Sequence, residues 1–257
     1  MTGAAGAEAP DIAVAGLPAA PAIVFVHGTR LTRSVWVAQL AGLSDEFRTI
    51  ALDLPGHGTR ADESFTLDGA ADALSATIRD QASGGRAVVV GLSLGGYVAM
   101  ALAAREPDRI RGLVVSGATA EPVGLLSLPC LTLAAVVDRV EDDRLDRLNA
   151  AFLRRRYPPA IAEPIVAGGF WWRGGSAALR ALVGERFIPR LAAYPGRTLI
   201  LNGDLDVLFR LSAPAFAAAA RDARRVRLAG ATHLANLDRP AAFNEAVRRF
   251  AGSLGTG

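Results

Sequence analysis

Short apolar runs, most of them ended by a glycine or a polar residue, recur along the chain and limit the folds open to it. The runs cover residues 22–26, 49–52, 87–90, 113–115, 198–201 and 225–228. Three of the six are apolar at every position and two more differ only by a leading threonine, which fits strands that are covered on both faces, as in a parallel sheet. Amphipathic stretches separate them. The pattern therefore predicts an α/β fold with a mostly parallel central sheet flanked by helices.

Three of the amphipathic stretches begin with a helix-start signal. Ser34 and Thr66 are typical helix caps, and Pro240 suits a first helical position. Each is followed by apolar residues at a spacing of about three or four, so we expect one side of each helix to pack on the sheet.

The regular alternation of strand-like apolar runs and amphipathic stretches stops between about residues 121 and 190. This stretch predicts helices over 125–137, 141–156 and 176–187, and it contains the adjacent aromatic residues Phe170, Trp171 and Trp172. We therefore expect residues 1–120 and 191–257 to form the core. Residues 121–190 would form a helical lid inserted over one end of the sheet.

Charge and hydropathy exclude several classes of protein. The 28 basic residues are all arginine, they are scattered, and 25 acidic residues leave a net charge of only +3. Such a surface does not follow a nucleic-acid backbone, so we expect no nucleic-acid partner. No apolar run approaches the roughly 20 residues that cross a bilayer. The first 17 residues lack the basic start of a secretion signal, which favours a cytoplasmic protein. The sequence carries no signal for an oligomeric state.

The segment Gly91-Leu92-Ser93-Leu94-Gly95 matches the pattern G-x-S-x-G. It follows a predicted strand and precedes a predicted helix, the setting that this motif requires. A serine on such a sharp turn is strained, and its neighbours must be small. The following helix N-terminus can stabilise an anion. Ser93 is thus a candidate nucleophile, although a short motif also fits a plain glycine-rich turn.

A serine nucleophile needs a base, and histidine suits neutral pH. His27, His57 and His233 all lie near strand ends, but only His233 follows Ser93, as the usual order Ser, acid, His requires. Asp204 and Asp206 both follow the run at 198–201 and both qualify as the acid that orients the imidazole.

Five motifs in this order resemble the α/β-hydrolase superfamily over nearly the whole chain. They are His27-Gly28-Thr29 and the segments 53–58, 91–95, 203–206 and 230–233. The resemblance is nearest to small serine esterases and lactonases, such as pimeloyl-carrier methyl esterases, enol-lactonases and the menaquinone-pathway synthase. It implies Asp206 as the acid, an oxyanion hole from the N–H groups of Thr29 and Leu94, and structural roles for His27 and His57. It also implies that no metal or organic cofactor is needed.

The sequence departs from that superfamily at two places. The segment before residue 22 is short for the usual leading antiparallel hairpin, so we expect one or two edge strands to be missing. Arg30 stands where small or apolar residues are more usual. Its guanidinium could bind a substrate carboxylate, or it could pair with an acid of the surface or the lid.

These features predict a serine hydrolase that cleaves a carboxylic ester, thioester or lactone through an acyl-enzyme on Ser93. We expect a small-molecule acyl substrate whose pocket is lined by Arg30 and the aromatic residues Trp36, Tyr97, Phe170, Trp171 and Trp172, although aromatic residues at helical spacing also fit a plain core. Two alternatives use the same scaffold. One is a lyase, synthase or C–C hydrolase with the same triad, and the other is a ligand-binding receptor with little turnover.

Overall fold

The computed structural model describes residues 11–255. Residues 1–10 lie outside the described residues. They include part of the stretch in which we expect no secretion signal. A seven-stranded sheet has the order β1-β3-β2-β4-β5-β6-β7. Every neighbouring pair is parallel except β1 and β3, so the predicted mostly parallel sheet is confirmed. The strands are β1 (Ile12–Ala15), β2 (Ala22–Val26), β3 (Arg48–Leu52), β4 (Ala87–Leu92), β5 (Ile110–Ser116), β6 (Arg197–Gly203) and β7 (Asp222–Leu228).

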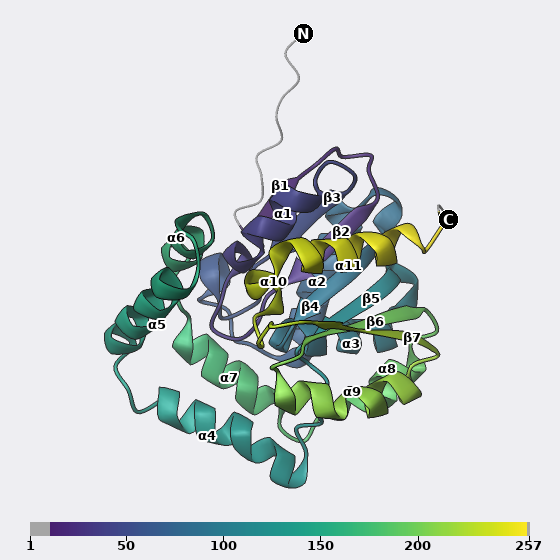
Figure 1. The fold of residues 1–257 in the computed structure, drawn as a ribbon. Coiled ribbons are helices and arrows are strands. Elements are labelled where there is room, and N and C mark those ends of the chain that lie inside the picture. Colours follow the sequence, from purple (N-terminus) through teal and green to yellow (C-terminus); the bar gives the residue numbers. More distant parts are fainter. Residues whose placement is uncertain (1–10, 256–257) are drawn as a thin grey trace.

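Helices cover both faces of this sheet (Figure 1). They are α1 (Val37–Leu43), α2 (Leu67–Gln81), α3 (Leu94–Arg105), α4 (Leu128–Val137), α5 (Asp142–Arg156), α6 (Pro159–Ala167), α7 (Trp172–Leu182), α8 (Phe187–Ala193), α9 (Val207–Ala219), α10 (Ala235–Asp238) and α11 (Pro240–Gly252). In the described part of the chain, none of them is both long and apolar enough to cross a membrane.

The continuous apolar runs are explained by two hydrophobic cores, one on each side of the sheet. Along β2, Val24 and Val26 pack into the core that α2, α3 and α8 cover. The alternate residues Ile23 and Phe25 pack into the core beneath α1 and α11. Successive side chains of a strand point to opposite faces, so a strand buried on both faces is apolar throughout.

Two of the three helix-start predictions are confirmed. The Thr66 side chain accepts a 3.0 Å hydrogen bond from the Gly69 N–H, and Pro240 is the first residue of α11. The prediction for Ser34 is wrong. Ser34 lies inside a 3₁₀ turn that is capped by Thr32, which has the extended backbone that a cap needs, and α1 begins only at Val37.

At the N-terminal edge, the sheet carries one antiparallel strand among residues 11–255. The four-residue strand β1 pairs with β3, with Ile12 opposite Leu52. The expected loss of one or two edge strands also concerns residues 1–10, which lie outside the described residues, so it stays a prediction.

Between β5 and β6 the chain is helical, as the break in the regular alternation predicts. The predicted stretches 125–137 and 141–156 correspond to α4 and α5, each with a small shift of its start. The predicted helix over 176–187 is wrong at both ends, because α7 starts at Trp172 and stops at Leu182. The helices α7 and α8 also contribute to the core beside α3, through Leu182 of α7 and through Phe187 and Leu191 of α8. The helices α4 to α6 form the part of the insertion that projects farthest from the sheet (Figure 1).

Candidate active site

Ser93 occupies a sharp turn between β4 and α3. Its backbone has φ 52° and ψ −117°, and Ser93 and Arg30 are the non-glycine residues between 11 and 255 with positive φ. Such a conformation costs of order 1–3 kcal/mol. A side chain at Gly91 would collide with the Gly95 carbonyl, and one at Gly95 would collide with the carbonyl of Val26. The two glycines of the motif therefore let the turn pack against the end of β2.

His233 and Asp206 are joined by a hydrogen bond. Nδ1 of His233, on the loop after β7, lies 2.9 Å from Oδ2 of Asp206, which follows β6 and precedes α9. The Asp206 side chain is nearly buried, whereas the imidazole is 37% exposed. Asp204 has another partner, because its carboxylate accepts a 2.8 Å hydrogen bond from the Gly230 N–H. The structure thus places Asp206, and not Asp204, at the imidazole.

The end of β5 brings Ser93 and His233 to one place. The Ser93 N–H donates to the Ser116 carbonyl at 2.8 Å. A Cβ added at the next residue, Gly117, would lie 2.7 Å from Cε1 of His233 and 3.4 Å from Oδ2 of Asp206. All three predicted residues therefore border residues 116–117. Within residues 11–255 no direct hydrogen bond joins Ser93 to the ring, and such contacts are often loose before a substrate binds.

His27 and His57 have both ring nitrogens engaged. His27 donates from Nδ1 to the Gly28 carbonyl at 2.8 Å and accepts from the Leu54 N–H at 3.0 Å. His57 donates to the Pro55 carbonyl at 3.0 Å and accepts from the Arg30 N–H at 3.2 Å. These bonds connect the turn after β2 to the turn after β3.

Burial also removes the two histidines as bases. It lowers the pKa of His27 to about 4 and the pKa of His57 to about 3. Both rings are therefore neutral near pH 7, and neither has a free nitrogen that could accept a proton from Ser93. His233 is left as the histidine with an open ring nitrogen.

The N–H groups of Thr29 and Leu94 are available to a ligand. Leu94 is the first residue of α3, so its N–H has no acceptor inside the helix. Among the bonds of residues 11–255, neither this N–H nor that of Thr29 donates to a protein acceptor, whereas the N–H of Arg30 is bonded to His57. A Cβ at Gly28, next to Thr29, would lie 3.4 Å from Cβ of Ser93. The two donors are thus near the serine.

The aromatic residues predicted to line a pocket have different positions. The prediction for Trp36 is wrong, because its side chain is fully buried in the core, with ring centroids 5.0 Å from Phe25 and 6.0 Å from Phe243. Tyr97 is buried against Phe187, with centroids 4.4 Å apart, and its hydroxyl donates to the Ala120 carbonyl.

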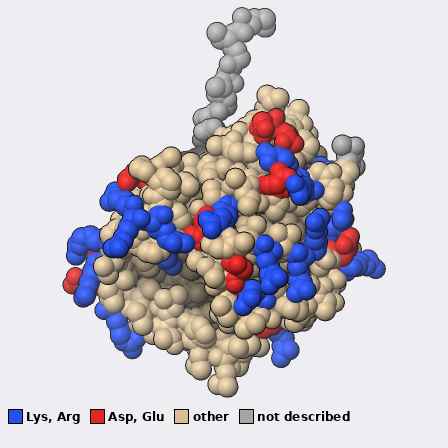
Figure 2. Space-filling model, in the orientation of Figure 1, with Lys and Arg blue, Asp and Glu red and all other residues tan. Residues whose placement is uncertain are grey.

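The aromatic residues at the start of α7 do lie near the turn after β2. The Arg30 guanidinium lies over the Trp172 ring, 5.1 Å from its centroid, and the Trp171 N–H donates to the Arg30 carbonyl at 2.9 Å. Phe170 packs on Trp172 with centroids 6.1 Å apart. Figure 2 shows the molecule hollowed beside α7, with mainly uncharged atoms in the hollow and arginines around it.

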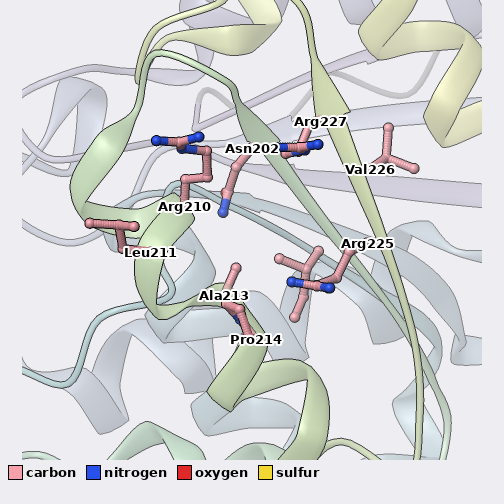
Figure 3. A pocket seen from close by; sticks show the side chains of 9 residues that line it. Asn202, Arg210, Leu211, Ala213, Pro214, Arg225, Val226 and Arg227 are labelled. Atoms are coloured by element: carbon pink, nitrogen blue, oxygen red, sulfur yellow. The ribbon is translucent and has the colours of Figure 1, made fainter.

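A different hollow, of about 520 Å³, lies between α9 and β7 and is drawn in Figure 3. Arg210 of α9 and Arg225 and Arg227 of β7 line it, and Asn202 of β6 lies beside them. None of the residues predicted for the active site borders this hollow, so it is separate from the serine turn.

Sequence reasoning did not find two residues that contact the imidazole. Phe209, in the first turn of α9, stacks on His233 with centroids 5.0 Å apart and planes at 28°. Gly117 lies against Cε1 and Nδ1 of the ring, and its φ of 58° is one that a residue with a side chain rarely adopts. The pair Ser116-Gly117 at the end of a predicted strand was the available signal for the second of these contacts.

This fold and this arrangement of residues define a class of protein, and comparison with known families identifies it. The family model described as "Alpha/beta hydrolase family" matches residues 23–246. The chain belongs to the α/β-hydrolase family.

Similar proteins include several named hydrolases. A pimeloyl-[acyl-carrier protein] methyl ester esterase of Nitrosomonas europaea is 39% identical over 99 residues, 38% of this chain and 38% of that protein, so this match spans little more than a third of either chain. A 2-(acetamidomethylene)succinate hydrolase of Mesorhizobium japonicum is 29% identical over 90% of this chain and 87% of its own. The crystal structure of the enol-lactonase from Burkholderia xenovorans LB400 superposes with a TM-score of 0.78, 25% identity, and coverage of 94% of this chain and 95% of that one.

Proposed function

We propose that this chain hydrolyses a carboxylic ester, thioester or lactone through an acyl-enzyme on Ser93. The observation that carries the proposal is the 2.9 Å bond between Asp206 and His233, formed beside the residues that also hold the Ser93 turn. The names of the relatives, an esterase, an enol-lactonase and a hydrolase, support hydrolysis of such bonds. The substrate is a small acyl compound, and the reaction needs no metal or organic cofactor.

The reaction would have two halves. Ser93 Oγ attacks the acyl carbon while Nε2 of His233 takes its proton, and the same proton then passes to the departing alcohol, thiol or lactone oxygen. Water next attacks the ester on Ser93, gives its proton to Nε2 and releases the acid, and the proton returns to Oγ. Asp206 keeps the proton on Nδ1 and stabilises the charged ring.

The oxyanion that forms in each half would accept hydrogen bonds from the N–H groups of Thr29 and Leu94. Donors fixed in this way are worth about 3 kcal/mol each, because they need no reorganisation when the charge develops. The start of α3 adds its positive end to the same side.

Residues 121–190 would act as a lid on this site. In this proposal the wall of the acyl pocket, where α7 meets the turn after β2, is formed by Arg30, Phe170, Trp171 and Trp172. Tyr97 of α3 packs against Phe187 of α8 instead.

Turnover of p-nitrophenyl esters by wild type and by Ser93→Ala tests the proposal. We expect measurable hydrolysis that falls at least about 10³-fold in Ser93→Ala, with Ser212→Ala, a serine of α9 outside the site, as the matched control. Equal rates for wild type and Ser93→Ala would contradict it. Proton exchange at carbon without ester turnover would favour a lyase, and ligand binding without either would favour a receptor.

A further inference from the structure

Arg30 is an arginine without an acidic partner within the described range 11–255. No carboxylate there lies within ion-pair distance of its guanidinium, and its Nε is buried without an acceptor. The two arginines of α7 differ in this respect, because Arg173 and Arg180 both pair with Asp138. The sequence left open a pairing of Arg30 with a surface or lid acid, and the structure provides none.

The backbone holds Arg30 in one orientation. Its φ of 58° is unusual for arginine, and it is fixed by the bond from its N–H to His57 and by the bond that its carbonyl accepts from Trp171. A strained backbone of this kind persists only where the surrounding contacts hold it in place, and such residues cluster at functional sites.

The guanidinium is stacked on one face, and within residues 11–255 its N–H groups make no hydrogen bond. It lies over Trp172, whose own Nε1 donates to Asp146 at 2.6 Å and so keeps the indole in place. A contact with a ring uses the flat face of a guanidinium, whereas its N–H groups point outward in the plane. The donors of Arg30 therefore remain available to a planar anion.

Burial makes this arrangement costly without a ligand. It lowers the pKa of Arg30. A buried cation is stabilised best by an opposite charge that also accepts its hydrogen bonds, and a carboxylate fits the two parallel donors of arginine. Arg30 directly follows Thr29, a proposed oxyanion donor, so such a carboxylate would belong to the same substrate molecule.

We propose that Arg30 binds a carboxylate in the acyl part of the substrate, so that the substrate class is a half-ester, thioester or lactone of a short dicarboxylic acid. This inference rests on the proposed function. Water supplies the hydroxyl of the new acid and the proton of the released alcohol, and the carboxylate on Arg30 is unchanged by the reaction.

The kinetic test compares charged and uncharged acyl groups on one leaving group. Mono-p-nitrophenyl succinate and glutarate are assayed beside p-nitrophenyl pentanoate. We expect wild type to prefer the anionic esters in kcat/KM, and Arg30→Gln to lower the ratio of anionic to neutral kcat/KM at least about tenfold. Arg30→Lys keeps the positive charge but loses the planar pair of donors. Its ratio of anionic to neutral kcat/KM should lie between the ratios of wild type and Arg30→Gln. An unchanged ratio in Arg30→Gln would overturn the inference.

Arg180→Gln is the matched control, since it removes a partly exposed arginine of α7 that is paired with Asp138. It should keep the wild-type ratio. If it lowers the ratio as much as Arg30→Gln does, general attraction between the protein and anions explains the preference, and the inference is wrong.

A binding measurement separates this inference from the proposed function. Glutarate is titrated calorimetrically into Ser93→Ala and into Ser93→Ala/Arg30→Gln, with melting curves to show that both are folded. We expect binding that weakens at least about tenfold without Arg30. If glutarate binding depends on Arg30 but wild type hydrolyses no ester, the proposed hydrolase function is wrong and carboxylate binding by Arg30 still holds. If ester turnover depends on Ser93 but glutarate binding does not depend on Arg30, only the proposed carboxylate binding by Arg30 is wrong.

Discussion

The Phe209 ring stacks on the imidazole of His233, with centroids 5.0 Å apart and planes at 28°. Phe209 lies three residues after Asp206, the N-cap of α9. The start of this helix therefore supplies both the carboxylate that binds Nδ1 and the ring that covers the imidazole face. The turn is anchored further by a hydrogen bond from the Thr119 hydroxyl to the Phe209 carbonyl. One helical turn thus fixes the orientation of the proposed base.

Phe209→Ala should lower kcat for p-nitrophenyl acetate about fivefold, because the loss of a stacked ring raises the barrier by roughly 1 kcal/mol. The melting temperature should change little, since the side chain is only partly buried. Phe152→Ala, which truncates an exposed phenylalanine of α5, is the control and should keep wild-type kcat. A Phe209→Ala enzyme with wild-type kcat would show that the stacking has no effect on the base.

Gly117→Ala should reduce kcat by at least about 10²-fold, because the added Cβ would lie 2.7 Å from Cε1 of His233 and displace the ring. The comparison is Gly84→Ala. Gly84 also has positive φ, 69°, but a Cβ there meets nothing within 4 Å. Both variants carry the backbone strain of a side chain at positive φ, and their melting temperatures measure its cost. The difference in kcat between them therefore reports the contact with the imidazole. Equal activity in the two variants would contradict this role of Gly117.

Asp206→Asn should lower kcat about 10³- to 10⁴-fold, because an amide at this position favours the wrong tautomer of His233. Asp204→Asn should act on stability instead, by weakening the bond to the Gly230 N–H that holds the loop after β7. Rates and urea unfolding of both variants check the assignment. A larger loss of rate in Asp204→Asn than in Asp206→Asn would reverse the roles of the two aspartates.

The buried histidines predict loss of stability in mild acid. The folded pKa values, about 4 for His27 and about 3 for His57, lie below the usual 6.5. The unfolded chain therefore takes up protons first as the pH falls. Their stabilisation is complete above pH 6.5 and is lost as the pH falls toward 4, at up to about 1.4 kcal/mol per pH unit for each histidine. Urea unfolding between pH 7.5 and 4.5 should show a smaller slope for His57→Gln than for wild type, and identical slopes would contradict the account.

Much of the fold and the main site residues could be predicted because their signals are local. Ser93, Asp206 and His233 each follow a predicted strand, and parallel strands bring such positions to one edge of the sheet. No local signal in the sequence distinguishes Asp204 from Asp206 as the partner of His233. Both follow β6 within four residues, and only the packing of the loop after β7 decides which carboxylate meets the imidazole.

Other features were missed for physical reasons. Trp36 has the spacing of a helix face, and spacing does not distinguish a core from a pocket wall. The helix α6 starts with prolines and contains Pro164, which obscures its pattern, and β1 has only four residues. Phe209 and Gly117 contact His233 from distant positions in the sequence. Nothing near Phe209 indicates its contact, and for Gly117 the only local signal is its place directly after a predicted strand.

The most direct test of the account is to react the protein with a fluorophosphonate and to locate the adduct by peptide mass spectrometry. We expect one adduct per chain, on Ser93, formed at least about 10²-fold more slowly in His233→Ala, because the imidazole would no longer accept the serine proton. An adduct on another residue, or labelling of Ser93 at the same rate without His233, would contradict the proposed triad.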